Sequence, residues 1–302
     1  MMATVLITGG NGLIGKQLRR MLLDRGYEVS IVSRTRKPVD GCKVYAWNIE
    51  QHKLDDEAID TADYIIHLAG ENIGSKRWTL KRKKEIIESR ILTAQLLFEK
   101  VIERKRNIHA FISASAAGYY GMVTSGKIFT ETDQPSSDFT GLTCREWEEA
   151  GKMFQNAGIR TVFIRTGVVL AKESEALSKM VLQVKTGFGS ATGNGKQYLS
   201  WIHIDDLCRI YISALENTAM TGAYNATAPE YITNHEFMRK LSLVLRKPFW
   251  FPNIPAFAMK MLFGEMSGLL LRGSRISSEK IRSTGFEFQY PDVESTLKNI
   301  LK

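Results

Sequence analysis

The spacing of three glycines near the N-terminus limits the fold of this chain more than any other feature. Gly9, Gly12 and Gly15 follow the apolar, β-branched run TVLIT and open the segment IGKQLRRMLLDRG, whose apolar residues recur at helical spacing. Glycine permits a tight turn between strand and helix and lets the backbone approach a bound pyrophosphate. The first N–H groups of the helix and the positive end of its dipole would then face the phosphates. The turn therefore predicts a dinucleotide site in a strand–turn–helix unit.

Alternating strands and helices fill the first two-thirds of the chain. Further strand-like runs are EVSIVS, KVYAW, DYIIHLAG, HAFISAS and TVFIRTGVVL, with helical segments between most of them. Strands that are apolar throughout indicate a parallel sheet covered on both faces. We therefore expect an α/β fold, a Rossmann-type doubly wound parallel sheet with a smaller C-terminal substrate or cap domain. The predicted dinucleotide-binding domain covers residues 1–170, completed by about 203–228, and the smaller domain covers 171–202 and 229–302.

Charge and cysteine content limit the classes of partner. The net charge is +9, and its densest basic run, residues 76–90, contains acids and reads as a solvated helix face or a site for an anionic small molecule. It lacks the aromatic, zinc-finger or arginine-rich patterns of nucleic-acid binding. Three cysteines without a CxxC pair argue against a disulfide framework or a metal site and fit a reducing cytoplasm. We expect a cytoplasmic monomer or homodimer with a small-molecule substrate and with no metal, nucleic acid or membrane partner.

The most apolar late segment is FAMKMLFGEMSGLLL, residues 257–271. Two glycines and a glutamate interrupt it, and it is too short to span a bilayer. Three locations are open for it: a partner chain, the ligand cleft or the core of its own domain. The core is the expectation, since it is the usual place for such a run.

The end of the second predicted strand indicates the cofactor. An NAD site commonly has an acid here that binds the ribose 2′-hydroxyl. This chain instead has Ser33 and Arg34, followed by Arg36 and Lys37. A guanidinium can pair bidentately with a 2′-phosphate, which a carboxylate would repel. We therefore predict NADP(H), with Arg34 as the principal contact and Ser33 as a hydrogen-bond donor.

Several motifs in the same order carry a family resemblance: TGGNGLIG, HLAGENI, SASAAGYYG, IRTGVVL and SWIHIDDL. Together they resemble an extended short-chain dehydrogenase/reductase of the atypical branch called the epimerase family, whose members are labelled NAD(P)-dependent nucleotide-sugar epimerases. The tract from residue 263 to 297 resembles that branch's own C-terminal domain of unknown role. The resemblance covers nearly the whole chain. It implies a discontinuous substrate domain and a dinucleotide in the cleft between the two domains.

The resemblance also implies roles for individual residues. It places Leu68, Ala69 and Gly70 against the cofactor, lets Glu85 and Arg90 reach it, and brings Val168 near the nicotinamide end. With the glycine turn and the second strand, the predicted cofactor site consists of Gly9, Gly12, Leu13, Ile14, Gly15, Ser33, Arg34, Leu68, Ala69, Gly70, Glu85, Arg90 and Val168.

The chain departs from the wider superfamily at its acid/base residues. Those reductases use a tyrosinate whose pKa is lowered by a lysine four residues later, with a glutamate four residues after that. Anchored on Glu148, this register places Thr140 and Cys144 at the tyrosine and lysine positions. A threonine hydroxyl is far too weak an acid for this task. The usual Tyr-x-x-x-Lys dyad is therefore missing.

Other groups remain candidates for the catalytic chemistry. Ser115 is the predicted substrate-facing hydroxyl, and Tyr120 is a second choice from the pair of phenols in GYYG. Asp205 is expected to cap the helix after WIHI. Three functions stay open: an NADP(H)-dependent oxidoreductase or nucleotide-sugar epimerase with other acid/base groups, a tightly held cofactor that is used transiently, or an NADP(H)-binding sensor or partner-binding protein without turnover.

Overall fold

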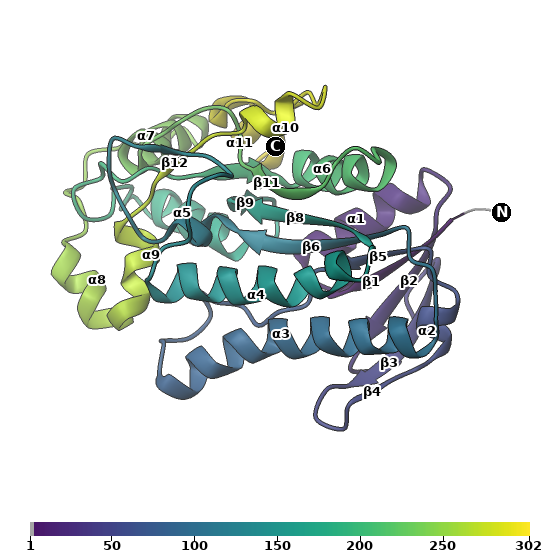
Figure 1. The fold of residues 1–302 in the computed structure, drawn as a ribbon. Coiled ribbons are helices and arrows are strands. Elements are labelled where there is room, and N and C mark those ends of the chain that lie inside the picture. Colours follow the sequence, from purple (N-terminus) through teal and green to yellow (C-terminus); the bar gives the residue numbers. More distant parts are fainter. Residues whose placement is uncertain (1–2) are drawn as a thin grey trace.

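A computed structural model describes residues 3–302 and contains one large sheet (Figure 1). Its eight strands lie in the order β11-β8-β6-β5-β1-β2-β3-β4. All neighbours pair in parallel except β3 and β4 at one edge. The strands are β1 (Thr4–Thr8), β2 (Glu28–Ser33), β3 (Cys42–Asn48), β4 (Lys53–Leu54), β5 (Tyr64–His67), β6 (Ala110–Ala116), β8 (Arg160–Thr166) and β11 (Gly222–Ala226).

Helices cover both faces of this sheet. Figure 1 shows α3 (Leu80–Glu103) and α4 (Phe139–Asn156) along one face, and α1 (Leu13–Leu23) and α6 (Ile204–Glu216) on the other. Separate hydrophobic clusters fill the two layers, one around Leu18 of α1 and Leu207 of α6, the other around Leu97 of α3 and Phe154 of α4. The arrangement confirms the predicted doubly wound α/β fold. The remaining helices are α2 (Glu57–Asp60), α5 (Glu175–Lys185), α7 (Asn234–Val244), α8 (Ala256–Phe263), α9 (Gly268–Leu271), α10 (Glu279–Arg282) and α11 (Val293–Ile300), with 3-10 turns η1 (Ala117–Tyr120) and η2 (Gly264–Ser267).

Local capping sets where the two long helices begin. The Thr79 hydroxyl accepts a hydrogen bond from the Arg82 N–H at 3.1 Å, and α3 starts at the next residue. The Asp138 carboxylate accepts one from the Gly141 N–H at 2.9 Å and caps α4 in the same way. Each cap satisfies an N–H that would otherwise lack a partner inside the helix. The stretch around Thr140 is therefore an ordinary helix start.

The predicted strand TVFIRTGVVL is two strands in the structure. β8 ends at Thr166, and after Gly167 the chain forms β9 (Val168–Leu170), which pairs with β10 (Trp201–His203) and not with the main sheet. A Cβ at Gly167 would lie 2.7 Å from the Ser200 carbonyl oxygen, so only glycine allows this close crossing. A second short sheet joins β7 (Ile128–Phe129) to β12 (Arg275–Ile276).

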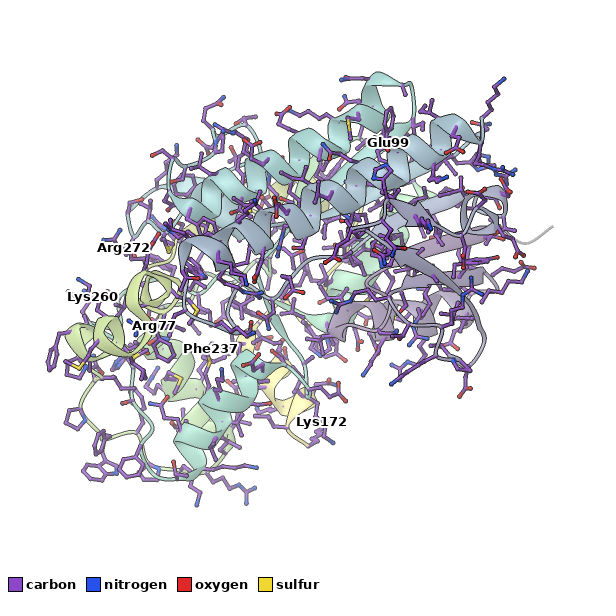
Figure 2. The ribbon with its side chains drawn as sticks, turned by 90° about the horizontal axis from the view of Figure 1, so that it is seen from below. Arg77, Glu99, Lys172, Phe237, Lys260 and Arg272 are labelled. Atoms are coloured by element: carbon purple, nitrogen blue, oxygen red, sulfur yellow. The ribbon has the colours of Figure 1, made fainter. Side chains whose placement is uncertain are left out.

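A further hydrophobic cluster lies among the segments expected to form the smaller domain. It joins Leu177 of α5, Phe237 of α7 and Leu297 of α11 around the buried Trp201 (Figure 2 labels Phe237). Ile281 and the nearby Phe286, however, belong to the cluster of the α1–α6 layer. The C-terminal segment is thus divided between two cores, and the domain boundaries stay a prediction.

The expectation that the apolar tract 257–271 lies in the core is wrong. Met259 and Met266 are buried, but Phe257 and Met261 of α8 are 69% and 76% exposed. The tract is too short to bury all sides of its helical turns, so one face remains outside. Within the part of the chain that the structure describes, no helix has both the length and the apolar composition needed to cross a membrane.

His67 at the end of β5 makes stability depend on pH. Burial, together with the positive charge of Arg90, lowers the pKa of His67 to about 3. The unfolded chain therefore binds one more proton than the folded chain between about pH 6.5 and pH 3, so stability falls as the pH drops through this window. We expect His67→Gln to remove up to about 1.4 kcal/mol of this loss per pH unit. Denaturant unfolding between pH 7 and pH 4 measures it, with the exposed His109→Gln as the control; equal slopes in both variants would contradict the assignment.

Candidate functional site

The glycine turn between β1 and α1 has the geometry of an anion site. Gly9 has a φ of +69°, and a Cβ there would lie 2.9 Å from the Leu68 backbone. A Cβ at Gly15 would lie 2.5 Å from the Gly9 oxygen, so the helix packs directly on the turn. Gly12 is the N-cap of α1, no side chain caps the helix, and its first turn holds no acid. The first N–H groups of α1, including those of Leu13 and Ile14, are thus left for a ligand, as a pyrophosphate requires.

A substitution at Gly12 is expected to affect cofactor binding much more than stability. Its φ is −74°, and a Cβ there would meet only the Gly9 oxygen, at 3.3 Å. Gly12→Ala is therefore expected to cost less than about 1 kcal/mol of unfolding free energy, while its methyl group enters the space for the pyrophosphate and weakens NADP⁺ binding by roughly tenfold or more. Thermal unfolding and calorimetric titration measure the two effects. Gly15→Ala is the contrasting variant, expected to lose stability as well; unchanged affinity in Gly12→Ala would contradict the site.

The end of β2 offers one exposed guanidinium that has no close carboxylate partner among residues 3–302. The Arg34 side chain is 84% exposed, and its Nη1 atom lies 4.0 Å from Oε1 of Glu71. Arg36 is already paired, since its Nη2 atom donates to both carboxylate oxygens of Asp55 at 2.8 and 2.9 Å. The Ser33 hydroxyl accepts a hydrogen bond from the Thr35 N–H at 3.3 Å and keeps its own proton to donate. Arg34 and Ser33 are thus available to bind a phosphate group, whereas Arg36 forms an ion pair within the protein.

The segment after β5 lies against the glycine turn, because β5 is the strand next to β1. β5 pairs with β1, so Leu68, Ala69 and Gly70 lie beside the glycine turn, and the Ala69 N–H donates to the Thr8 hydroxyl at 3.2 Å. A Cβ at Gly70 would lie 3.0 Å from Cζ of Arg90. Because Gly70 has no side chain, the buried guanidinium of Arg90 in α3 can lie close to the backbone that follows β5.

Arg90 is held in a fixed position inside the protein. Its Nη1 and Nη2 atoms donate to the carbonyl oxygens of Ile86 at 2.7 Å and Glu71 at 3.0 Å, and its guanidinium lies 4.8 Å from the Trp147 ring centre. Burial lowers the pKa of Arg90 to about 10, so it stays charged near neutral pH. A fixed buried cation beside the cofactor strand fits an electrostatic role in cofactor binding.

Glu85 is engaged by an arginine that the sequence reasoning missed. The buried Arg82 donates through Nη1 to Glu85 at 3.1 Å and to Glu71 at 3.0 Å, and through Nη2 to the Asn72 carbonyl at 2.8 Å. This arginine ties the start of α3 to the loop after β5. The spacing of Arg82 and Glu85, three residues apart on a helix, was the available signal. A contact between Glu85 and the cofactor stays a prediction.

The two positions of the missing dyad are buried and inert. The Thr140 hydroxyl donates to Asp138 at 2.7 Å, within the cap of α4. Burial, together with the negative charge of Glu148, raises the pKa of the Cys144 thiol to about 12. A Cβ at Gly118 would lie 3.2 Å from the Thr140 Cβ and 3.6 Å from the Cys144 sulfur, so both side chains face the loop after β6. Neither can exchange a proton with a substrate near neutral pH.

The two predicted catalytic side chains, Ser115 and Tyr120, are buried and hydrogen-bonded to other protein groups. The Ser115 hydroxyl donates to Glu148 at 2.7 Å and is buried. The Tyr120 hydroxyl donates to the Asn225 amide oxygen at 2.6 Å, and burial raises the pKa of Tyr120 to about 12. Both hydroxyls therefore donate to internal partners, and a catalytic role for either one stays a prediction. The sequence could not show this, since the partners are distant in the chain.

Arg165 of β8 is the centre of this internal network. It donates to Glu148 through Nε and Nη2 at 2.8 and 2.9 Å and to the Tyr120 hydroxyl at 3.0 Å. Burial acts to lower the pKa of Arg165, but the hydrogen bonds and charge of Glu148 outweigh it and raise the pKa. Its guanidinium also lies 3.4 Å from the ring centre of Tyr119. Tyr119 is half-buried, and its hydroxyl makes no hydrogen bond to residues 3–302, which leaves it as the free phenol of the pair.

The chain from β9 to the start of α6 contains Val168 and the helix cap that was expected at Asp205. Val168 is half-buried, and its N–H donates to the Ser200 carbonyl at 2.8 Å where β9 leaves the main sheet. His203, and not Asp205, caps α6: its Nδ1 atom accepts the Asp205 N–H at 3.0 Å. Asp206 accepts the N–H groups of Gln289 and Tyr290, both at 2.9 Å. Asp206 therefore orders the C-terminal segment, whereas Asp205 accepts a hydrogen bond from the side-chain amide of Gln17 in α1.

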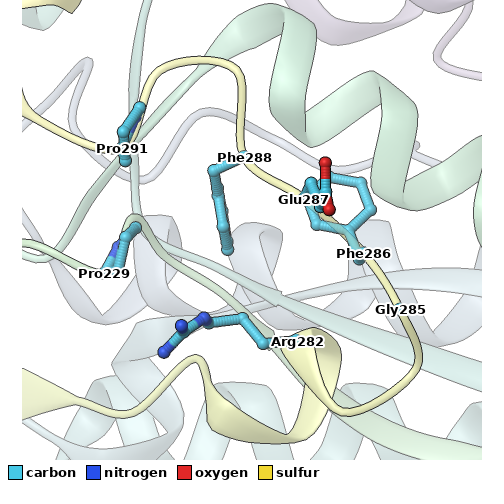
Figure 3. Close-up of a pocket in the computed structure, with 7 residues that line it drawn as sticks. All are labelled: Pro229, Arg282, Gly285, Phe286, Glu287, Phe288 and Pro291. Carbon is cyan, nitrogen blue, oxygen red and sulfur yellow. The ribbon is translucent and has the colours of Figure 1, made fainter.

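Two cavities lie apart from these residues. One of about 440 Å³ is lined by Pro229 and the C-terminal segment, and Figure 3 shows Phe288 and Arg282 extending into it. The other, of about 390 Å³, is lined by residues that include Glu131 and Lys280. No residue predicted to bind the cofactor lines either cavity. Within residues 3–302, no group of three or more His, Cys, Asp or Glu side chains has the arrangement of a metal site.

Comparison with known proteins gives matches over nearly the whole chain. Residues 254–300 match a domain of unknown function. The epimerase family protein YfhF of Bacillus subtilis is 34% identical over 98% of this chain and 97% of its own length. The structure of the human epimerase family protein SDR39U1 with NADPH has a TM-score of 0.87 and 30% identity, over 98% of each chain. A nucleoside-diphosphate sugar epimerase of Corynebacterium glutamicum has a TM-score of 0.80 and 31% identity, over all of this chain and 58% of its own.

These matches confirm the resemblance drawn from the motifs. The sequences agree along the chain, and the solved folds agree with the order of its strands. Residues 5–226 match the family described as the NAD dependent epimerase/dehydratase family, and the chain belongs to it.

Proposed function

We propose that this chain binds NADP(H) and uses it to oxidise, reduce or epimerise a small molecule, with a nucleotide sugar as the substrate class. The observation that carries the proposal is the uncapped start of α1 next to an exposed, weakly paired Arg34 at the end of β2. The human relative solved with NADPH supports the cofactor. The printed name of the Corynebacterium relative supports the substrate class.

Each group has a distinct task in this proposal. The first N–H groups of α1 bind the pyrophosphate, and Arg34 with Ser33 binds the 2′-phosphate. Arg90 provides a buried positive charge beside Gly70, near the position where a superfamily lysine is replaced by Cys144. The bound cofactor supplies a hydride donor or acceptor. Proton transfer falls to a group other than Thr140 and Cys144.

Tyr119 is the protein group best placed to exchange that proton. Tyr119 is the residue after Gly118, and the side chains of Thr140 and Cys144 face Gly118. The Tyr119 hydroxyl makes no hydrogen bond within residues 3–302. The Arg165 guanidinium lies 3.4 Å from the centre of its ring and holds the ring in place. We expect Tyr119→Phe to lower turnover while leaving NADP⁺ affinity unchanged, whereas an equal loss of both would indicate a purely structural role.

Calorimetric titration of the wild-type chain with NADP⁺ and NAD⁺ tests the cofactor. Tighter binding of NADP⁺ is expected, and tighter binding of NAD⁺ would overturn the proposal. Reaction is tested separately by mixing the chain with NADPH and nucleotide sugars, following loss of the reduced cofactor and changes in the sugar. The two measurements are independent, so a failure of catalysis leaves the binding result intact.

A second function is favoured by one observation. All four candidate side chains are buried. The hydroxyls of Thr140, Ser115 and Tyr120 donate to other protein groups, and the pKa of the Cys144 thiol is raised. A protein that binds NADP(H) without turnover needs none of them. In that case NADP(H) would bind with the same preference, but no carbonyl substrate would consume it and no isotope would exchange at the nicotinamide C4 atom. Such a result in a broad screen would favour a redox sensor or partner-binding protein.

A further inference from the structure

An apolar patch projects from the end of the molecule that carries α8. We define it as Phe188, Trp250, Phe251, Phe257, Met261 and Leu262, all of them exposed. Trp250, for example, is 69% exposed, although a tryptophan side chain has much apolar area to bury. Figure 1 shows α8 at the margin of the fold, and Figure 2 shows Lys260 of α8 at the same end. Exposed apolar groups gathered in this way mark a surface for binding.

The patch is supported by two segments that are joined to each other. The backbone of Ile254 donates to Ala191 at 2.9 Å and accepts from Gly193 at 2.8 Å. The Phe188 and Phe251 rings meet edge-on with centres 5.2 Å apart, and Trp250 lies 5.7 Å from Phe251. These contacts hold Phe188, Trp250 and Phe251 together, and Phe257, Met261 and Leu262 follow on α8, a few residues further along the same segment.

Charge around the patch has one sign. Exposed basic residues flank it on both supporting segments, namely Lys185, Arg246, Lys247 and Lys260. Residues 176–204 and 237–264 contain no aspartate or glutamate at all. The surface is therefore complementary to an anionic partner.

We propose that this patch binds the surface of an anionic lipid bilayer. Aromatic and aliphatic side chains enter the boundary between headgroups and acyl chains, while neighbouring Lys and Arg contact the anionic headgroups. Tryptophan favours this interface because its ring is apolar and its N–H remains near water. This proposal departs from the sequence-based expectation of no membrane partner, because binding to a bilayer surface requires no spanning segment.

A second copy of the chain is a poorer occupant. A symmetric dimer through this patch would bring the same face of both subunits together. It would place Arg246, Lys247 and Lys260 against their own copies without an acid in either supporting segment. None of the patch residues lines either of the two cavities described above.

Trp250 provides a direct readout. The other four tryptophans are at most 9% exposed, so a shift of emission on vesicle binding reports on Trp250. Mixed vesicles of phosphatidylcholine and phosphatidylglycerol at low salt are expected to sediment the chain and shift its fluorescence to the blue. Vesicles of phosphatidylcholine alone, or high salt, are expected to reduce binding by roughly tenfold or more.

Two sets of variants complete the test. Trp250→Ser with Phe257→Ser and Met261→Ser, and separately Arg246→Gln with Lys247→Gln and Lys260→Gln, should each weaken binding roughly tenfold or more. Ile102→Ser is the matched control, because Ile102 is also exposed but lies at the far end of α3. No sedimentation with anionic vesicles, or equal binding by the triple variants and the control, would overturn the proposal. So would a dimer in ultracentrifugation that the apolar variant dissociates.

Discussion

Replacing Arg34 with alanine is expected to weaken NADP⁺ binding by roughly 30- to 140-fold and to leave NAD⁺ binding nearly unchanged. A guanidinium bound to a phosphate contributes about 2–3 kcal/mol, and each 1.4 kcal/mol is a tenfold change in affinity. Arg34 is exposed and its nearest carboxylate oxygen is 4.0 Å away, so little else in the protein depends on it. Calorimetric titration with both dinucleotides measures the effect.

Arg36→Ala is the matched control for this experiment. It removes an arginine two residues away that is already paired with Asp55 at 2.8 and 2.9 Å. The control should retain most of its preference for NADP⁺. If Arg34→Ala weakened NAD⁺ and NADP⁺ equally, Arg34 would act on the shape of the site and not on the 2′-phosphate.

Breaking the buried pair of Glu148 and Arg165 is expected to have the largest effect on stability. Both side chains are almost fully buried, and Glu148 binds both Arg165 and the Ser115 hydroxyl. Removing one partner of such a pair leaves a buried charge without its counter-ion, which costs about 3–5 kcal/mol. Glu148→Gln and Arg165→Met should each lower the free energy of unfolding by about this amount, as measured by urea denaturation.

The double variant and an exposed pair make this prediction specific. Glu148→Gln combined with Arg165→Met should lose less than the sum of the single losses, because no unpaired charge remains. Arg145 and Glu146 form an exposed pair on the same helix at 2.7 Å, and Arg145→Gln should change stability by no more than about 1 kcal/mol. Additive losses in the double variant would show that the two charges do not interact.

The local parts of the site were predictable from the sequence. Gly9, Gly12 and Gly15 follow a strand and open a helix, and the backbone geometry they require appears in the structure. Arg34 at the end of β2 was found because a strand end fixes where its next side chain lies. Short-range patterns of this kind suffice where residues near one another in the chain build the site.

The catalytic roles of Ser115 and Tyr120 stay predictions, and no local pattern in the sequence shows the partners that their hydroxyls bind. Their hydroxyls donate to Glu148 and Asn225, which lie 33 and 105 residues further along the chain. Only the packing of β6, β8, β11 and α4 brings these partners together around Arg165. Tyr119 precedes Tyr120 in the 3-10 turn η1, where successive side chains point in different directions, and its hydroxyl makes no hydrogen bond within residues 3–302.

By itself, the sequence determined the doubly wound fold, the family, the glycine turn and the absence of the usual acid/base pair, because each depends on periodicity or on fixed spacing in the chain. Tertiary structure alone decided which polar side chains are internal, and that the tract around α8 is exposed. Those outcomes depend on which distant surfaces meet. The local sequence does not show whether a particular hydroxyl or apolar ring is buried, because that depends on the distant residues that bind or cover it in the folded chain.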